Sequence, residues 1–297
     1  MEEFSTLSVH SRADVNPGPV RERGYSVTPR TIGVWPLFFA FAVFLMVPVL
    51  AMFANSVAEP ADAGLSNFRT VFADPTFARF AANTIRTALI VSGVNGVVGY
   101  CYAYAMYRCG RIMRLILLNC AMLPFCTSVL VQSFAWTVIL RDTGIVNSVL
   151  TYFGIATEPI SLLRTPLAVT IGMAQLLLPF AILPVYVSMT KFDPDQLRAA
   201  RSLGAGPTSA FWQVFFPQTI IGLVAALLLV FILSAGYYIT PLLLGGPADQ
   251  PVAVLIGTQI TRQLNWGIAG SMSAITTGVV FLILAAGWRT VNKVFLY

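Results

Sequence analysis

The stretch DPDQLRAARSLGA at residues 193–205 lies between two long apolar runs and is followed by FFP at residues 215–217. This polar interruption has the pattern of a short helix, a glycine turn and a proline restart. The residues from Asp195 onward are enough for about two helical turns, in which Leu197, Ala200 and Leu203 recur at a spacing of three on roughly one face. The pattern indicates a docking element held at a membrane surface.

The composition of the whole chain indicates that lipid is its solvent. Of its 297 residues, 57% are hydrophobic and only 10% are charged, and the mean hydropathy is +0.78. A soluble domain carries about 25% charged residues, so this chain has too much apolar surface to hide from water. The net charge of +6 is spread over loops without a basic block. That distribution favours loops facing a membrane and argues against a nucleic-acid partner.

Six runs are long enough to cross a bilayer, which takes about 20 residues. They are residues 32–57, 84–107, 112–140, 166–190, 218–244 and 267–291. We therefore expect an all-α integral membrane protein, with a polar N-terminal tail at residues 1–30 and a transmembrane domain at residues 31–297. Prolines inside three of the runs predict kinks at Pro36, Pro48, Pro124, Pro179 and Pro184.

The distribution of Lys and Arg predicts the orientation. Twelve of these residues lie on the side of the tail and of residues 193–205, and six lie on the other side. The positive-inside rule then places both termini and the 191–217 loop in the cytoplasm, and residues 58–83, 141–165 and 245–266 outside. The apolar spacing after Gly144 predicts a short helix in the outer interface. Gly93, Gly96 and Gly99 recur every third residue, which favours close helix packing over the alternative of a glycine-lined pore.

Several kinds of chemistry find no support in the residues. His10 is the only histidine, and the four cysteines form no CxxC pair, so neither a metal site nor a disulfide framework is expected. Neither a HExxH nor a GxSxG pattern occurs. Lys191 and Lys293 are the only lysines, and neither follows a phosphate-binding glycine loop. We therefore expect no catalytic residues, no metal and no cofactor in this chain. ATP and its Mg²⁺ would have to bind a partner.

The six runs contain no Asp or Glu. A transporter coupled to protons or sodium usually needs a carboxylate within the membrane, although backbone carbonyls can also bind sodium. A stand-alone secondary transporter, with residues 191–217 as an ordinary connector, therefore stays open as the alternative. A membrane-embedded enzyme would need a nucleophile, a base or a metal cluster, and no such set is evident.

The loop at 191–217 resembles the EAA loop of ABC importer permeases, whose pattern is E-A-A-x3-G-x9-I-x-L-P. Ala199, Ala200, Gly204 and Pro217 match at the same spacing, and Val214 and Phe216 are apolar substitutes. In that family the loop forms a coupling helix that rests in a cleft of the ATPase subunit. The resemblance implies a role in ATPase coupling for the residues Asp195, Leu197, Arg198, Ala199, Ala200, Leu203, Gly204 and Pro217.

The local physics agrees with that motif. Gly204 is predicted to end the helix in a left-handed conformation, which glycine adopts at the least cost, and Pro217 to begin the next span. One position departs from the pattern, because Arg198 stands where the motif has glutamate. An ion pair made by that glutamate cannot be carried over, and Asp195, one turn earlier, is the substitute to consider.

Further segments are similar to the spermidine/putrescine-type permeases, most of all to the first of that system's two permeases. They are residues 124–128 with Gln132 and Trp136, residues 144–147, residues 240–247 and residues 265–267. Together they cover about residues 32–291. The resemblance implies a type I importer fold with two permeases, two cytoplasmic ATPases and an external solute-binding protein. It implies a small solute, such as a polyamine or a related amine or amino-acid derivative, and a bacterial inner-membrane location.

Polar and aromatic residues within the spans are the candidates for contact with the solute, namely Gln132, Trp136, Gln175, Tyr237 and Tyr238. Aromatic faces attract cations by about 0.5–2 kcal/mol each. For each residue, helix packing or interfacial anchoring is the competing interpretation. Gln132 is the strongest candidate, because an amide in mid-span requires a partner.

Overall fold

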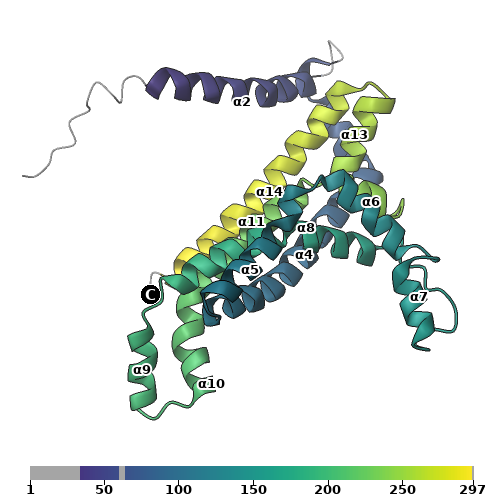
Figure 1. Ribbon diagram of the computed structural model, residues 1–297. Helices are drawn as coiled ribbons and strands as arrows, with labels where there is room; N and C mark the ends of the chain where they lie inside the picture. The colour runs from purple at the N-terminus through teal and green to yellow at the C-terminus, as the bar shows by residue number, and fades with distance from the viewer. Residues whose placement is uncertain (1–33, 60–63, 296–297) are drawn as a thin grey trace, which may run out of the picture. The chain divides into compact units, whose positions relative to one another are not determined.

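A computed structural model describes residues 34–59 and 64–295, so the predicted tail at residues 1–30 lies outside the described residues. The described chain is helical throughout (Figure 1). Its elements are α2 (Val34–Ala58), α3 (Ser66–Ala73), α4 (Pro75–Arg108), α5 (Arg111–Met122), the 3-10 turn η1 (Leu123–Cys126), α6 (Val129–Leu140), α7 (Ile145–Tyr152), α8 (Pro166–Thr190), α9 (Pro194–Ser202), α10 (Pro207–Ala210), the π-helical turn η2 (Phe211–Phe215), α11 (Phe216–Ala235), α12 (Ile239–Leu244), α13 (Val252–Arg262) and α14 (Trp266–Phe295).

Six segments of the described chain are long and apolar enough to cross a membrane, as predicted. They are Phe39–Ala58, Pro75–Arg108, Val129–Tyr152, Pro166–Thr190, Pro207–Ala235 and Trp266–Gly287. The chain divides into two compact units, residues 1–50 and 51–297. The first contains, among the described residues, the N-terminal part of α2, and the second contains every other element.

Helices α4, α8 and α11 form the centre of the second unit, where they pack against one another. A Cβ atom built on Gly99 of α4 would lie 2.8 Å from the Cβ of Ala181 in α8, and one built on Gly96 would lie 2.6 Å from Leu227 Cδ2 in α11. The packing role predicted for these two glycines is confirmed, because a side chain at Gly99 would meet Ala181 of α8 and one at Gly96 would displace Leu227 of α11. Gly93 has nothing within 4 Å of a built Cβ, so the prediction is wrong for that residue.

Prolines shape the spans differently from one another. Pro179 and Pro184 lie inside the uninterrupted helix α8, and Pro48 lies inside α2. Pro124 instead lies in η1, which separates α5 from α6, so the predicted third span at residues 112–140 is two helices and a 3-10 turn. Proline removes a backbone donor, and a short tighter turn is one way to accommodate the loss.

The predicted fifth span at residues 218–244 is wrong at both ends. The helical stretch begins earlier, at Pro207, and α11 ends at Ala235 with Gly236 as its C-cap. A separate short helix, α12, then begins at Ile239. The apolar run continues through this break, and hydropathy alone therefore could not reveal it.

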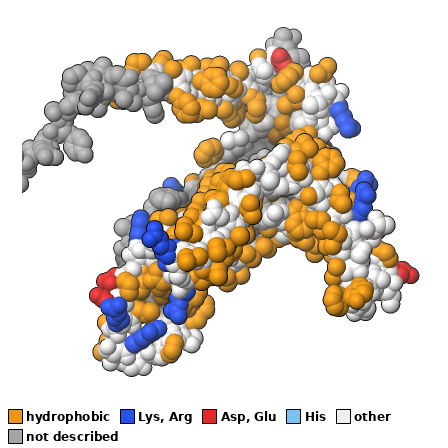
Figure 2. Space-filling model, viewed as in Figure 1, with side chains coloured by type: hydrophobic (Ala, Val, Ile, Leu, Met, Phe, Trp, Pro, Cys, Tyr) orange, Lys and Arg blue, Asp and Glu red, His pale blue; other side chains and the backbone are white. Residues whose placement is uncertain are grey.

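The three segments predicted to lie outside contain short helices: α3, α7 and α13. The short helix expected after Gly144 is confirmed as α7. Within the second unit, α9 and α10 lie at one end of the long helices, while α7 and α13 lie at the other (Figure 1). Figure 2 shows apolar side chains along the long helices and Lys and Arg side chains gathered at the α9 end. This arrangement places the candidate docking helix at a basic end of an apolar bundle.

Candidate functional site: the projecting helix, its joint and a cavity between the helices

Helix α9 is defined by cap residues at both ends. The Asp193 carboxylate accepts a hydrogen bond of 3.0 Å from the backbone N–H of Asp195, and Pro194 occupies the first turn. At the other end Gly204 has φ +89°, and the N–H of Ala205 donates to the carbonyl of Ala200 at 3.1 Å. This is the glycine-terminated ending in which a left-handed residue closes the helix. The predicted helix and its glycine stop are confirmed.

The inner side of α9 holds the helix to the bundle. Leu197 and Ala200 are half-buried, and Leu197 packs against the main core cluster. The side chains of Gln196 and Gln218 hydrogen-bond to each other and so link α9 to α11. Leu203 does not share this face as predicted, because it follows the last helical residue and is 89% exposed. An apolar side chain therefore protrudes at the tip.

The outward side of α9 carries small and charged residues. Asp195, Arg198, Ala199 and Ser202 are all exposed. The Arg198 guanidinium donates to the Asp195 carboxylate at 2.5 Å, with 78% and 73% of the two side chains exposed. Exposed pairs of this kind contribute only about 0–1 kcal/mol. Arg198, which stands where the motif has glutamate, is thus paired within its own helix. Its partner is Asp195, the residue considered above as a substitute for that glutamate.

An aromatic cluster forms the joint between α9 and the long helices. Phe215 is 3% exposed, and its ring centroid lies 4.9 Å from that of Phe192, 5.4 Å from Tyr107 and 5.8 Å from Tyr104. Phe211 stacks on Phe215 at 5.6 Å. Aromatic pairs add about 0.5–1.5 kcal/mol each beyond their buried area. The joint is therefore a packed connection rather than a loose loop.

Pro217 does not begin the next span as predicted, because α10, η2 and α11 run on without interruption from Pro207. The N–H of Phe216 bonds to the carbonyl of Phe211, five residues earlier, which is the π-helical pattern. A proline inside an α-helix clashes with the carbonyl four residues before it. The wider π turn immediately before Pro217 relieves this conflict and lets the helix continue.

The second candidate site is a cavity of about 530 Å³ that brings together three of the five predicted solute-contact residues. Gln132 and Gln175 line the cavity, and Trp136 donates its ring N–H to Gln175 Oε1 at 2.5 Å. Gln132 donates to the carbonyl of Pro124 at 2.8 Å and to the hydroxyl of Thr127. Its own Oε1 is buried and has no hydrogen-bond partner within the described chain. An unsatisfied buried acceptor costs about 1–3 kcal/mol, and Gln132 Oε1 is closed off from solvent rather than open to a ligand.

The two predicted tyrosines do not line this cavity. Tyr237 packs against the main core cluster, and Tyr238 is 39% exposed with its ring close to Gly257 of α13. Sequence reasoning missed Tyr102 and Thr127, which do line it. Thr127 lies within residues 124–128, one of the segments that are similar to the permeases. Tyr102 has no such signal in the sequence around it, because only the packing of α4 against α5 places its side chain at the cavity.

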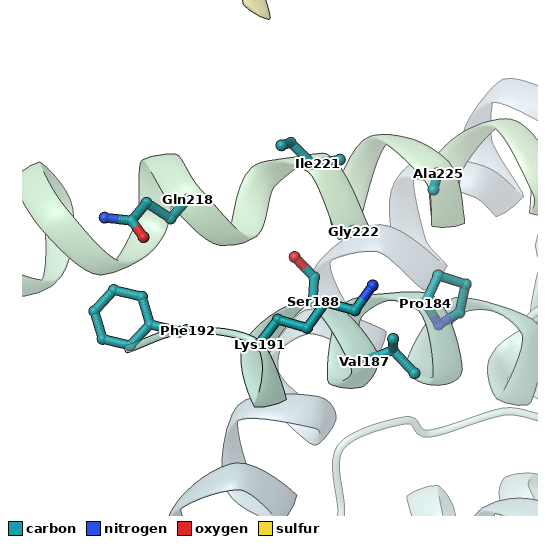
Figure 3. A pocket seen from close by; sticks show the side chains of 9 residues that line it. All are labelled: Pro184, Val187, Ser188, Lys191, Phe192, Gln218, Ile221, Gly222 and Ala225. Atoms are coloured by element: carbon teal, nitrogen blue, oxygen red, sulfur yellow. The ribbon is translucent and has the colours of Figure 1, made fainter. Parts of the chain in front are cut away.

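A groove of about 500 Å³ runs between α8 and α11 close to α9 (Figure 3). It is lined mostly by apolar residues, with Ser188, Lys191 and Gln218 as its polar members. Gly222 allows the two helices to approach, because a built Cβ would lie 2.8 Å from the carbonyl oxygen of Pro184. Among the described residues no group of His, Cys, Asp or Glu could hold a metal ion.

These features define a class of protein. The model of the family described as binding-protein-dependent transport system inner membrane component matches residues 96–291, and the chain belongs to this family. It is a multi-pass inner-membrane permease subunit of an ABC importer and not an enzyme. This match favours the permease over the stand-alone secondary transporter.

Individual proteins of known name resemble the chain over most of its length. The chain is 31% identical to the spermidine/putrescine transport system permease protein PotB of Haemophilus influenzae, over 92% of this chain and 96% of that protein. It is 30% identical to PotB of Escherichia coli strain K12, over 87% of this chain and 94% of that protein. A solved bacterial alginate ABC transporter, in complex with an alginate pentasaccharide-bound periplasmic protein, matches with a TM-score of 0.73 at 16% identity, covering 89% of this chain and 94% of that one. The structural likeness shows the type I importer permease fold.

Proposed function

We propose that this chain forms half of the translocation pathway of an importer for a small amine solute, with a second homologous permease as the other half. Two cytoplasmic ATPase subunits would drive it through α9, and an external binding protein would deliver the solute. The observation that carries the proposal is the geometry of α9, a helix capped at both ends that projects at the basic end of the bundle. The positive-inside rule supports placing this end in the cytoplasm.

The mechanism follows from how α9 is attached. ATP binding would close the ATPase dimer and push on the exposed side of α9 at Ala199 and on Leu203, which directly follows the helix. The joint at Phe215 and the link between Gln196 and Gln218 would pass the displacement to α8 and α11. A rigid-body movement of packed helices can convert such a push into alternating access.

The coupling role can be tested at Gly204. Replacement by valine forces a β-branched residue into φ +89°, which we expect to distort the end of α9 and to abolish solute-stimulated ATP hydrolysis in the assembled transporter. Gly206→Val is the matched control, because Gly206 has φ −66° and, like Gly204, nothing within 4 Å of a built Cβ. Normal stimulation in the Gly204→Val transporter would contradict the coupling role.

Support for an amine solute comes from the PotB relatives and from the uncharged amide and aromatic side chains that line the cavity. A protonated amine offers N–H donors, and hydrogen bonds to charged groups contribute about 1.5–3 kcal/mol. None of the residues that line the cavity is charged. We therefore assign the neutralising carboxylates to the second permease, and the cavity to orientation of the solute by amide and aromatic groups.

Substitution of Gln132 tests this assignment. Gln132→Met keeps the side-chain length but removes the amide, and we expect polyamine uptake to fall at least about tenfold while basal ATP hydrolysis is kept. Gln263→Met is the control, because Gln263 is exposed and lies away from the cavity, just after α13. Equal uptake by both variants would overturn the role of Gln132 without affecting the coupling proposal.

A further inference from the structure

A smaller cavity of about 220 Å³ lies where the last turn of α4, helix α9 and the π turn η2 meet. Tyr104, Tyr107 and Arg108 line it from α4, Leu197 and Arg201 from α9, and Phe211 from η2. It is distinct from the cavity at Gln132, with which it shares no lining residue. Aromatic side chains therefore form much of the wall, and two exposed arginines, Arg108 and Arg201, line the same small cavity.

The positive charge of this cavity is uncompensated within the described chain. The residues that line it include no Asp or Glu. The two nearest acidic residues in sequence are engaged elsewhere, since Asp193 caps α9 and Asp195 pairs with Arg198. That pair is the one salt bridge between described residues, so neither Arg108 nor Arg201 has an ionic partner among them. Both arginines are exposed, so an anion that reaches the cavity from solvent would supply the partner charge that neither has within the described chain.

The chemistry of the lining indicates which anion fits. Arginine offers a planar fork of donors that matches the oxygens of a phosphate group, and two arginines can hold one phosphate together. The volume is below the range of roughly 300–1,000 Å³ that holds a drug-sized ligand, which argues against a whole nucleotide. The ring centroid of Trp212 lies 5.3 Å from that of Phe211, and Trp212 is 57% exposed. Tryptophan and tyrosine rings gather at the depth of lipid headgroups.

We propose that this cavity binds the phosphate of an anionic phospholipid, held by Arg108 and Arg201. A general excess of cations at this end would attract such lipids to every arginine equally. The cavity distinguishes Arg108 and Arg201 from the other arginines, because both of them line it, one from α4 and the other from α9. A bound headgroup would therefore tie α9 to the membrane surface as well as to the bundle. This proposal does not depend on the ATPase or on the solute.

Native mass spectrometry of the detergent-purified full chain provides the test. Phosphatidylglycerol, phosphatidylcholine and inorganic phosphate are titrated separately, and we expect phosphatidylglycerol to bind at least about tenfold more tightly than phosphatidylcholine. The double variant Arg108→Gln/Arg201→Gln should lose this preference. Arg111→Gln should keep it, because Arg111 is exposed at the same end of the bundle but does not line the cavity.

Three results would overturn the proposal: no preference for phosphatidylglycerol, an equal loss in Arg111→Gln, or inorganic phosphate that binds as tightly as the lipid. The last would identify a site for free phosphate instead. Arg108→Lys/Arg201→Lys keeps the charge without the planar fork and should bind with intermediate affinity. This second double variant decides the question if the glutamine variant fails to fold.

Discussion

Gly99 and Gly93 lie in the same helix, α4, yet only Gly99 is in contact with a neighbouring helix. The difference is a matter of helical phase, since six residues do not complete a whole number of turns. The spacing of three that groups the glycines in the sequence therefore does not assign them the same environment. Only the packing of α8 against α4 in the folded structure determines that Gly99 is in contact and Gly93 is exposed.

The two glycines make a matched pair of test sites. We expect Gly99→Leu to lower the free energy of unfolding by about 1–3 kcal/mol or to shift α8, because its Cβ alone would lie 2.8 Å from the Cβ of Ala181. Gly93→Leu should cost nothing through packing and should gain helix propensity. Thermal unfolding of the purified chain distinguishes the two. Equal melting temperatures would show that α4 and α8 do not pack as described.

At the scale of single elements, α9 depends on its caps more than on its surface charges. The Asp193 cap satisfies a backbone donor, whereas the pair between Asp195 and Arg198 is exposed to solvent. A lost N-cap costs about 0.5–2 kcal/mol, and an exposed ion pair about 0–1 kcal/mol. Loss of the Asp193 cap should therefore destabilise α9 more than loss of the ion pair between Asp195 and Arg198.

We expect Asp193→Ala to raise amide hydrogen exchange in residues 195–203 about fivefold, which corresponds to about 1 kcal/mol of lost helix stability. Asp195→Asn removes the ion pair with Arg198 but leaves the cap, and should change the exchange by less than about twofold. Hydrogen–deuterium exchange with mass spectrometry measures both variants. A larger effect of Asp195→Asn would show that the ion pair, rather than the cap, holds the helix.

Elements could be predicted from the sequence where the signal was local. The glycine stop at Gly204 and the six apolar runs are properties of neighbouring residues, and the structure has the corresponding helix and spans. The break at Gly236 and the π turn before Pro217 were not predicted. The break at Gly236 lies within a continuous apolar run, so hydropathy does not mark it. The π turn depends on how a helix adjusts to a proline inside it.

At the scale of the whole molecule, the candidate solute site could be predicted only in part. Gln132 and Gln175 lie in different spans, and their amides alone made them candidates. Tyr102 joins them, and Tyr237 does not, because of the way in which the long helices pack. Pairing across helices leaves no periodic trace in one sequence. The residue types were therefore predictable, whereas their convergence was not.

The proposed orientation of the molecule can be tested with two exposed positions at opposite ends of the second unit. Leu203 is 89% exposed after α9, and Tyr152 is 86% exposed at the end of α7. In a variant whose four native cysteines are replaced, we expect Tyr152→Cys to react in intact cells with a membrane-impermeant maleimide. Leu203→Cys should react only after the cells are opened. The reverse pattern would place α9 outside and contradict the proposal.

The protruding side chain of Leu203 also bears on how the cell handles this subunit before assembly. A copy without its partner displays the apolar side chain of Leu203 to water, directly after the last residue of α9. Cellular proteases and chaperones select chains by such exposed apolar segments. We therefore expect the subunit to be short-lived when it is produced alone, and its abundance to follow that of the protein that covers α9.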